Sequence, residues 1–116
     1  MPEWKKNMAS VWSIRYSLDS EADLNEIYDY IVDVSGESLT ATKFIRRLRL
    51  TIEKLSYLPH RYPLYLSCGV RRMNIGKYSV FYVIDTARRS VVVNRILHGA
   101  RHLDALLTGD DGDDNE

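Results

Sequence analysis

The stretch VRRMNIGKYSVFYVI, residues 70 to 84, contains two candidate β-strands on either side of a tight turn. Residues 70–75 mix polar and apolar side chains, whereas residues 78–84 are almost wholly apolar or aromatic. Gly76-Lys77 between them is typical of a two-residue hairpin, because glycine readily adopts the positive φ of the first turn position. The stretch therefore predicts a hairpin whose second strand lies in the middle of a sheet.

Strand signals also lie on both sides of this hairpin. Residues 85–89 can form a further turn, after which SVVVNRIL at residues 90–97 returns as the third strand of a meander. Near the N-terminus, VWSIRY at residues 11–16 is short and rich in β-branched and aromatic side chains. It predicts a first strand, separated from the meander by about fifty residues.

The first of two expected helices lies directly after this strand. Ser20, followed by Asp23 three residues later, indicates a capping box, and Gly36 supplies a C-terminal stop. Between them, apolar side chains recur at helical spacing. They are Leu24, Ile27, Tyr28, Ile31 and Val34.

The second expected helix begins near Ser38 or Thr40, either of which can cap it, and the segment ends before Pro59. Its apolar stripe consists of Ala41, Phe44, Ile45, Leu48, Ile52 and Leu55. Its outer face carries Lys43, Arg46, Arg47 and Lys54. Because few residues separate the helices, we expect an antiparallel helical hairpin. The order β-α-α-β-β-β predicts a two-layer α+β domain, with both helices on one face of a largely antiparallel sheet and the other face wholly or partly open.

Length and composition are consistent with one globular domain. We expect a frayed N-terminus over residues 1–10, a domain over residues 11–108 with a short last helix at 103–107, and a disordered acidic tail over residues 109–116. The sequence has no apolar run near the roughly 20 residues of a membrane helix, no signal-peptide pattern and a single cysteine, Cys68. A cytoplasmic location and no membrane partner are therefore expected.

The zero net charge hides a strong asymmetry along the chain. Residues 1–42 carry three basic and eight acidic side chains, residues 43–101 carry thirteen basic and two acidic, and residues 102–116 add six acidic groups. A positive middle on a neutral chain indicates an acidic partner for one face, and it does not indicate general nucleic-acid affinity. A solvated basic helix face is the alternative interpretation.

Four patterns follow one another along the chain: ADLNEIYDYI at 22–31, FIRRLRLTIEKLSYLP at 44–59, VRRMNIGKYSVFY at 70–82 and RILHGAR at 95–101. In this order they resemble the ParE/RelE toxins of type II toxin–antitoxin systems. The resemblance covers about residues 11–104, and the closing pattern is similar to the ParE branch in particular. It implies a toxin that needs no cofactor and is neutralised by a ParD-like antitoxin encoded beside it.

The resemblance leaves two targets open, because ParE-like toxins poison DNA gyrase, whereas RelE-like relatives cut messenger RNA on the ribosome. Fold alone does not separate the two activities. For gyrase, the expected target-binding residues are Arg95, His98 and Arg101. For the antitoxin, the expected anchors are Arg46, Arg47, Arg71 and Arg72.

RNA cleavage by 2′-hydroxyl attack requires a base, an acid and cations that stabilise the phosphorane. If the chain is a nuclease, its candidates share the open sheet surface and are Arg72, Arg95 and His98, with Tyr82 nearby. Without nuclease activity there is no catalytic residue, and His98 has a structural role at a strand end. A binding module without toxic activity is a third possibility. The i, i+4 pair His98 and His102 lacks a third ligand, so no metal site is expected.

Overall fold

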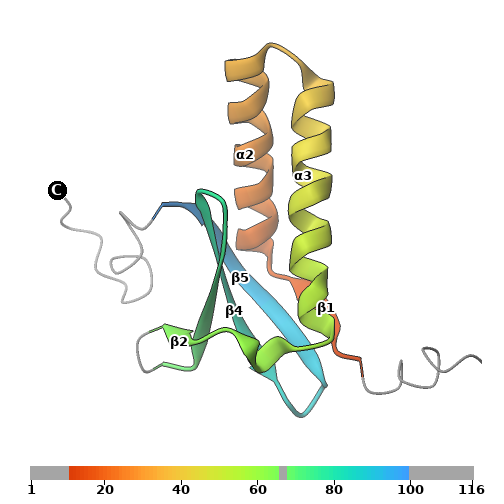
Figure 1. Cartoon of the computed structure of the whole chain (residues 1–116), viewed down its shortest axis with the longest axis vertical. Helices are drawn as coiled ribbons and strands as arrows, with labels where there is room; N and C mark the ends of the chain where they lie inside the picture. The colour runs from red at the N-terminus through yellow and green to blue at the C-terminus, as the bar shows by residue number, and fades with distance from the viewer. Residues whose placement is uncertain (1–10, 66–67, 100–116) are drawn as a thin grey trace, which may run out of the picture.

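The computed structural model describes residues 11–65 and 68–99, and the expected termini and the expected helix at 103–107 lie outside them. The described chain has one strand, then two helices, then two short 3₁₀ turns and four further strands (Figure 1). In chain order they are β1 Ser13–Tyr16, α2 Leu18–Ser35, α3 Ser38–Glu53, η2 Lys54–Ser56, η3 Pro59–Arg61, β2 Leu64–Tyr65, β3 Val70–Ile75, β4 Tyr78–Asp85 and β5 Ser90–His98.

The five strands form one sheet in the order β1-β5-β4-β3-β2. The predicted meander is confirmed: β3 pairs antiparallel with β4, β4 pairs antiparallel with β5, and β4 is the central strand. Two features were not predicted. β1 pairs with β5 in parallel, and the two-residue strand β2 pairs antiparallel with β3.

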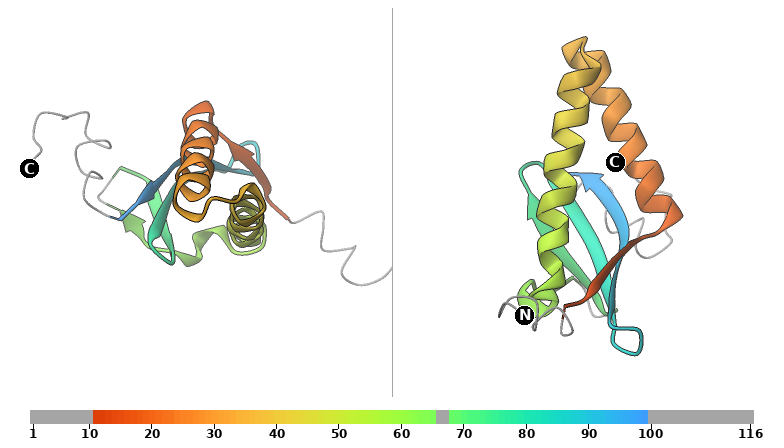
Figure 2. Two further views of the ribbon diagram at one scale, coloured as in Figure 1. Left: turned by 90° about the horizontal axis from the view of Figure 1, so that it is seen from above. Right: turned by 90° about the vertical axis from the view of Figure 1, so that its right-hand side faces the viewer.

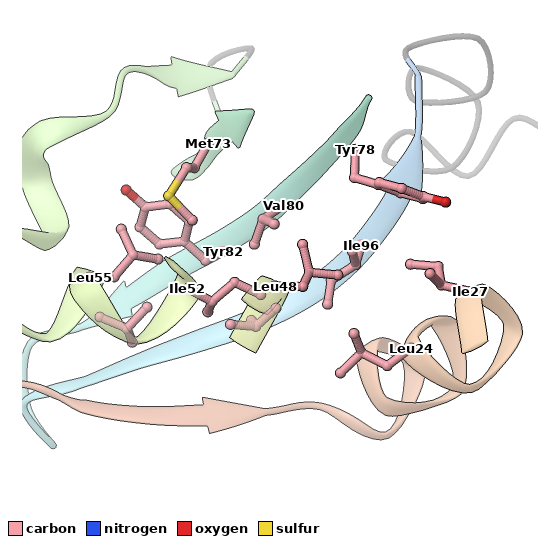
Figure 3. Close-up of a cluster of buried hydrophobic side chains, with 12 residues drawn as sticks. Leu24, Ile27, Leu48, Ile52, Leu55, Met73, Tyr78, Val80, Tyr82 and Ile96 are labelled. Atoms are coloured by element: carbon pink, nitrogen blue, oxygen red, sulfur yellow. The ribbon is translucent and has the colours of Figure 1, made fainter. Parts of the chain in front are cut away.

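Both helices pack on one face of the sheet, which confirms the two-layer α+β architecture (Figures 1 and 2). The helical hairpin extends past the sheet, so the turn between α2 and α3 lies beyond it (Figure 2). The core lies between the layers, where side chains of α2 and α3 meet those of β3, β4 and β5 (Figure 3). The members drawn and labelled there are Leu24, Ile27, Leu48, Ile52, Leu55, Met73, Tyr78, Val80, Tyr82 and Ile96.

The helix ends correct two sequence predictions. Ser17, not Ser20, is the N-cap of α2, because the Ser17 hydroxyl oxygen accepts a hydrogen bond of 3.0 Å from the Ser20 amide. The helix thus begins before the apolar stripe, at Leu18, which is 89% exposed and leaves no periodic signal. The predicted stop is confirmed, since Gly36 adopts a φ of 76° and its amide donates to Val32. This left-handed conformation strongly favours glycine.

The start of α3 also differs from the prediction. Neither Ser38 nor Thr40 caps the helix: its N-cap is Glu37, and Ser38 is the first helical residue. The Thr40 hydroxyl instead donates a hydrogen bond of 2.7 Å to the Glu37 carboxylate. At the other end, Lys54–Ser56 and Pro59–Arg61 tighten into 3₁₀ turns, so regular α-helix ends at Glu53, six residues before the proline. Neither helix of the described chain is long and apolar enough to cross a membrane.

Candidate functional site

Beyond the last residue of β1, the start of α2 supplies the hydrogen-bond partners of β5. The Ser17 amide donates to the Val93 carbonyl at 3.0 Å, and the Ser17 hydroxyl donates to the Asn94 carbonyl at 2.9 Å. Two residues further along β5, the Ile96 amide donates to Asp23 at 2.9 Å. The edge of β5 is therefore covered by side chains of α2, which is one way in which proteins protect the edge of a sheet.

Asp23 is the most connected polar side chain at this edge. Both of its carboxylate oxygens accept hydrogen bonds from Arg95, Oδ2 from Nε at 2.8 Å and Oδ1 from Nη2 at 2.9 Å. The Asp23 side chain is 7% exposed and that of Arg95 27%. These hydrogen bonds raise the pKa of Arg95 above its ordinary value, against the opposing effect of burial. Arg95 is thus already bound within the fold.

A β-bulge sets the position of Arg95. Tyr82 of β4 pairs with Val93 and Phe81 pairs with Arg95, so Asn94 is an extra residue in β5. The bulge allows Val93 and Ile96, three residues apart, to be buried in the same core. Without it, strict alternation would turn one of them away from the helices.

Tyr82 lies inside the core and not on a surface. Its hydroxyl donates a hydrogen bond of 2.7 Å to the Pro59 carbonyl, and the residue is fully buried. Burial raises the pKa of Tyr82 to about 12. The Tyr82 hydroxyl therefore stays protonated near neutral pH and anchors the turn that follows α3.

Arg72 and His98 occupy different surroundings. The Arg72 guanidinium lies over the rings of Tyr65 and Phe81, 5.4 and 5.9 Å from their centroids, on the sheet face opposite the helices. His98 ends β5 and packs edge-on against Tyr78, with ring centroids 5.1 Å apart. Both residues border a hollow of about 360 Å³ at the end of β5, where Lys77 also lies.

The structure does not bring the four nuclease candidates together. Arg72 and His98 share a hollow, but Tyr82 is buried on the helix side and Arg95 is paired with Asp23. The register places Arg72 and Arg95 on either side of Phe81, in one row across the sheet, but the Arg95 guanidinium is bound to the Asp23 carboxylate at the edge of β5. Arg101, the third expected target-binding residue, lies outside the described residues.

An apolar groove lies between α3 and the turn that joins β3 to β4. It encloses about 300 Å³, and its walls come from Phe44 and Leu48 of α3 and from Ile75 and Tyr78 of the hairpin. The rings of Phe44 and Tyr78 are 5.7 Å apart. Arg47 and Lys77 also line the groove, so its apolar walls are accompanied by two positive charges. The sequence marks these positions only as parts of two stripes, because the groove exists only once α3 lies beside the hairpin.

The four expected antitoxin anchors do not form one patch. Arg46 and Arg47 are exposed on α3, but only Arg47 borders the groove. Arg71 donates hydrogen bonds to the carbonyls of Tyr62 at 2.6 Å and His60 at 3.3 Å. Arg72 lies on the opposite sheet face. Arg71 therefore has a structural contact, and the other three are divided between two surfaces.

Asp23 and Ser17 are the site residues that the sequence analysis missed. Asp23 stands one turn before Ile27 on the buried stripe of α2, and an acidic side chain in a buried stripe indicates a buried basic partner. That signal was present but was interpreted as a helix cap. Among the described residues, no three His, Cys, Asp or Glu side chains gather where they could hold a metal ion.

The fold has counterparts of known structure. A chain of the chromosomal ParDE toxin–antitoxin system from Pseudomonas aeruginosa superposes with a TM-score of 0.68 at 19% identity, over 77% of this chain and 97% of the other. A chain of the RelBE2 toxin–antitoxin complex from Mycobacterium tuberculosis superposes with a TM-score of 0.52 at 21% identity, over 76% and 98%. At these identities the likeness shows the fold alone. A search of curated protein sequences gave no match.

The decisive comparison is with a protein family. The profile described as "ParE toxin of type II toxin–antitoxin system, parDE" matches residues 14–103. The match spans β1 to the end of β5 and includes Asp23, Arg95 and the apolar groove. It covers more than three quarters of the sequence, and the fold agrees with it. This chain belongs to the ParE toxin family of type II toxin–antitoxin systems.

Proposed function

We propose that this toxin acts by binding DNA gyrase and not by cutting messenger RNA. One observation carries the proposal: two of the four side chains that a nuclease would use are already engaged in the fold. The Tyr82 hydroxyl is buried against the Pro59 carbonyl, and the Arg95 guanidinium is bound to Asp23. The Tyr82 hydroxyl is not available to a substrate unless the core opens, and Arg95 would first have to break its ion pair with Asp23.

These contacts of Tyr82 and Arg95 matter because of what RNA cleavage requires. A proton acceptor, a proton donor and cations must meet around one phosphate. In the described residues, Arg72, Lys77 and His98 border one hollow and supply the positive charge and one titratable ring. Tyr78 also borders this hollow, and burial raises the pKa of its hydroxyl, but no carboxylate of the described chain lies in the lining. An inhibitor that works by binding needs only a shaped surface, which this arrangement supports.

The alternative is a RelE-like, ribosome-dependent endoribonuclease, and the hollow beside His98 is the observation that favours it. The two activities are separated by adding the purified protein to gyrase supercoiling and cleavage assays, and to a ribosome-dependent messenger-cleavage assay. We expect accumulation of cleaved DNA with gyrase and no messenger cleavage. Messenger cleavage that His98→Ala abolishes, with the fold intact by circular dichroism, would refute the proposal.

The apolar groove is the surface that we propose for the antitoxin. Antitoxin partners are consistent with the structural neighbours, both of which come from toxin–antitoxin systems. An amphipathic segment would place apolar side chains against Phe44, Ile75 and Tyr78 and acidic side chains beside Arg47 and Lys77. Of the predicted antitoxin anchors, only Arg47 lines this groove, and Lys77 lies there beside it.

A further inference from the structure

We propose that the acidic C-terminal segment, residues 110–116, folds back onto a cationic surface of the same chain that consists of Arg47, Arg72 and Lys77. The segment would screen this surface until a more strongly bound acidic partner displaces it. The proposal goes beyond the proposed function, because the contact is intramolecular and does not depend on whether the target is gyrase or the ribosome.

The cationic surface bends around the β3–β4 turn, because Arg47 and Arg72 lie on opposite faces of the molecule and Lys77 borders the hollows of both. Lys77 borders both hollows at this end of the molecule: the apolar groove, which it shares with Arg47, and the hollow at the end of β5, which it shares with Arg72. Arg47 and Lys77 are exposed, and Arg72 is half-buried. Three positive charges therefore surround one turn of the chain.

These three cations have no acidic partner within the described part of the chain. The ion pairs among the described residues are formed by Arg49, Arg88 and Arg95 instead. The hydrogen bonds of the Arg72 guanidinium go to neutral groups, the Asn74 amide oxygen at 3.0 Å and the Ser79 hydroxyl at 3.2 Å. An acidic partner for this surface would therefore have to come from outside residues 11–65 and 68–99.

The C-terminal segment has the matching charge and starts at the right place. Residues 110–116 read DDGDDNE, with five acidic side chains and no basic one. The last described residue, Gly99, donates a backbone hydrogen bond of 2.7 Å to the Lys77 carbonyl, so the chain leaves the fold beside the cationic surface. Even as a random coil, the eleven residues from Gly99 to Asp110 would span roughly 18 Å.

The stretch of chain between Gly99 and the acidic segment decides which basic surface the segment can reach most easily. Arg61 and Arg88 are also exposed, but they lie near η3 and the β4–β5 turn, at the end of the sheet away from the end of β5 (Figure 1). A single exposed ion pair strengthens a contact by only about 1.4- to 5-fold. Three such pairs at the roughly millimolar effective concentration of a short tether populate the contact as a minor, transient state, and salt would weaken it.

Paramagnetic relaxation measured on the full-length chain tests the contact directly. Exposed Cys68 is replaced by serine, and a nitroxide is attached through Asn115→Cys. At about 0.02 M salt we expect broadening of the backbone amides around Arg47, Arg72 and Lys77. At about 0.5 M salt, where the screening length falls from roughly 20 Å to roughly 4 Å, the broadening should disappear.

Two matched variants make the test decisive. Lys77→Glu should remove the broadening, whereas Arg61→Glu, the same charge change at the far end, should leave it. Neutralising the segment, with Asp→Asn at 110, 111, 113 and 114 and Glu116→Gln, should also remove it. Equal broadening with charged and neutral segments, or broadening centred on Arg61, would overturn the proposal and would leave the gyrase assays unaffected.

Discussion

Asp23 of α2 and Arg95 of β5 are 72 positions apart in the chain and form a two-point ion pair, with Nε–Oδ2 and Nη2–Oδ1 distances of 2.8 and 2.9 Å. The same carboxylate accepts the Ile96 amide, so one side chain joins the first helix to the last strand. Arg95 opens the closing pattern that resembles the ParE branch. Its contacts here give it a role in the fold, whatever it contributes to target binding.

The first prediction concerns the stability of this junction. Asp23→Asn removes the negative charge that pairs with Arg95 and one of the two carboxylate oxygens that accept hydrogen bonds. The substitution should lower the free energy of unfolding by about 2–3 kcal/mol. The loss should be smaller than for a fully buried pair because the Arg95 side chain is 27% exposed. Urea unfolding followed by tryptophan fluorescence measures it.

The control is the ion pair between α2 and α3. Arg49 and Glu21 are also 2.8 Å apart, but their side chains are 37% and 44% exposed. Glu21→Gln should therefore cost less than about 1 kcal/mol. Equal losses in the two variants would show that Asp23 does not hold the junction together.

The second prediction is a loss of stability in alkali. Because burial raises the pKa of Tyr82 to about 12, the folded chain keeps a proton that the unfolded chain releases above its ordinary value of 10. The stabilisation is complete below pH 10 and is lost as pH rises from 10 to 12, by roughly 1–3 kcal/mol. Burial raises the pKa of Tyr16 and Tyr78 as well, so they act in the same direction.

Tyr82→Phe separates this contribution from the others. The variant loses the hydrogen bond to Pro59 and about 1 kcal/mol at pH 7, but its stability should fall less steeply between pH 10 and pH 12. Tyr57→Phe is the control, since this tyrosine is 70% exposed. Parallel pH curves for wild type and Tyr82→Phe would contradict the assignment.

Local sequence signals predicted the helical hairpin and the meander, because both are set by periodicity and by turns such as Gly76-Lys77. The pairing of β1 with β5 could not be predicted in the same way. It joins Ser13 to Ser90 across the whole domain, and nothing within VWSIRY specifies a parallel partner. Strand β2 was missed since two residues, Leu64 and Tyr65, are too few for any alternation.

The candidate site was less predictable than the fold. Residue type and resemblance selected Arg72, Tyr82, Arg95 and His98, but the bulge at Asn94 and the burial of Tyr82 arise only from tertiary packing. A register shift of one residue changes the face of every following side chain. No local pattern around Arg95 indicates such a shift, so the residues that contact Arg95 could not be predicted from the sequence.

The third prediction tests the apolar groove as the antitoxin surface. Arg47→Glu places an acidic group at the rim, and it should weaken antitoxin binding by roughly tenfold, or about 1.4 kcal/mol, mostly through slower association. Arg46→Glu makes the same charge change one position away, outside the groove lining. Surface plasmon resonance at two salt concentrations compares them, and equal effects would place the antitoxin elsewhere.

The last prediction concerns the target and uses Arg101 and His98. If the closing segment acts by contact, Arg101→Ala should weaken gyrase poisoning without changing stability, because the arginine would then supply binding energy to the target. His98→Ala removes only an edge-on contact with Tyr78, so any loss of gyrase poisoning should follow the loss of stability. A nuclease predicts the reverse, since removing a general acid or base lowers the rate by roughly 10²- to 10⁴-fold while the protein stays folded. Gyrase-dependent DNA cleavage and thermal unfolding, measured on the same preparations, separate the two: a His98→Ala protein that is fully stable and fully inactive would rule out action by contact alone.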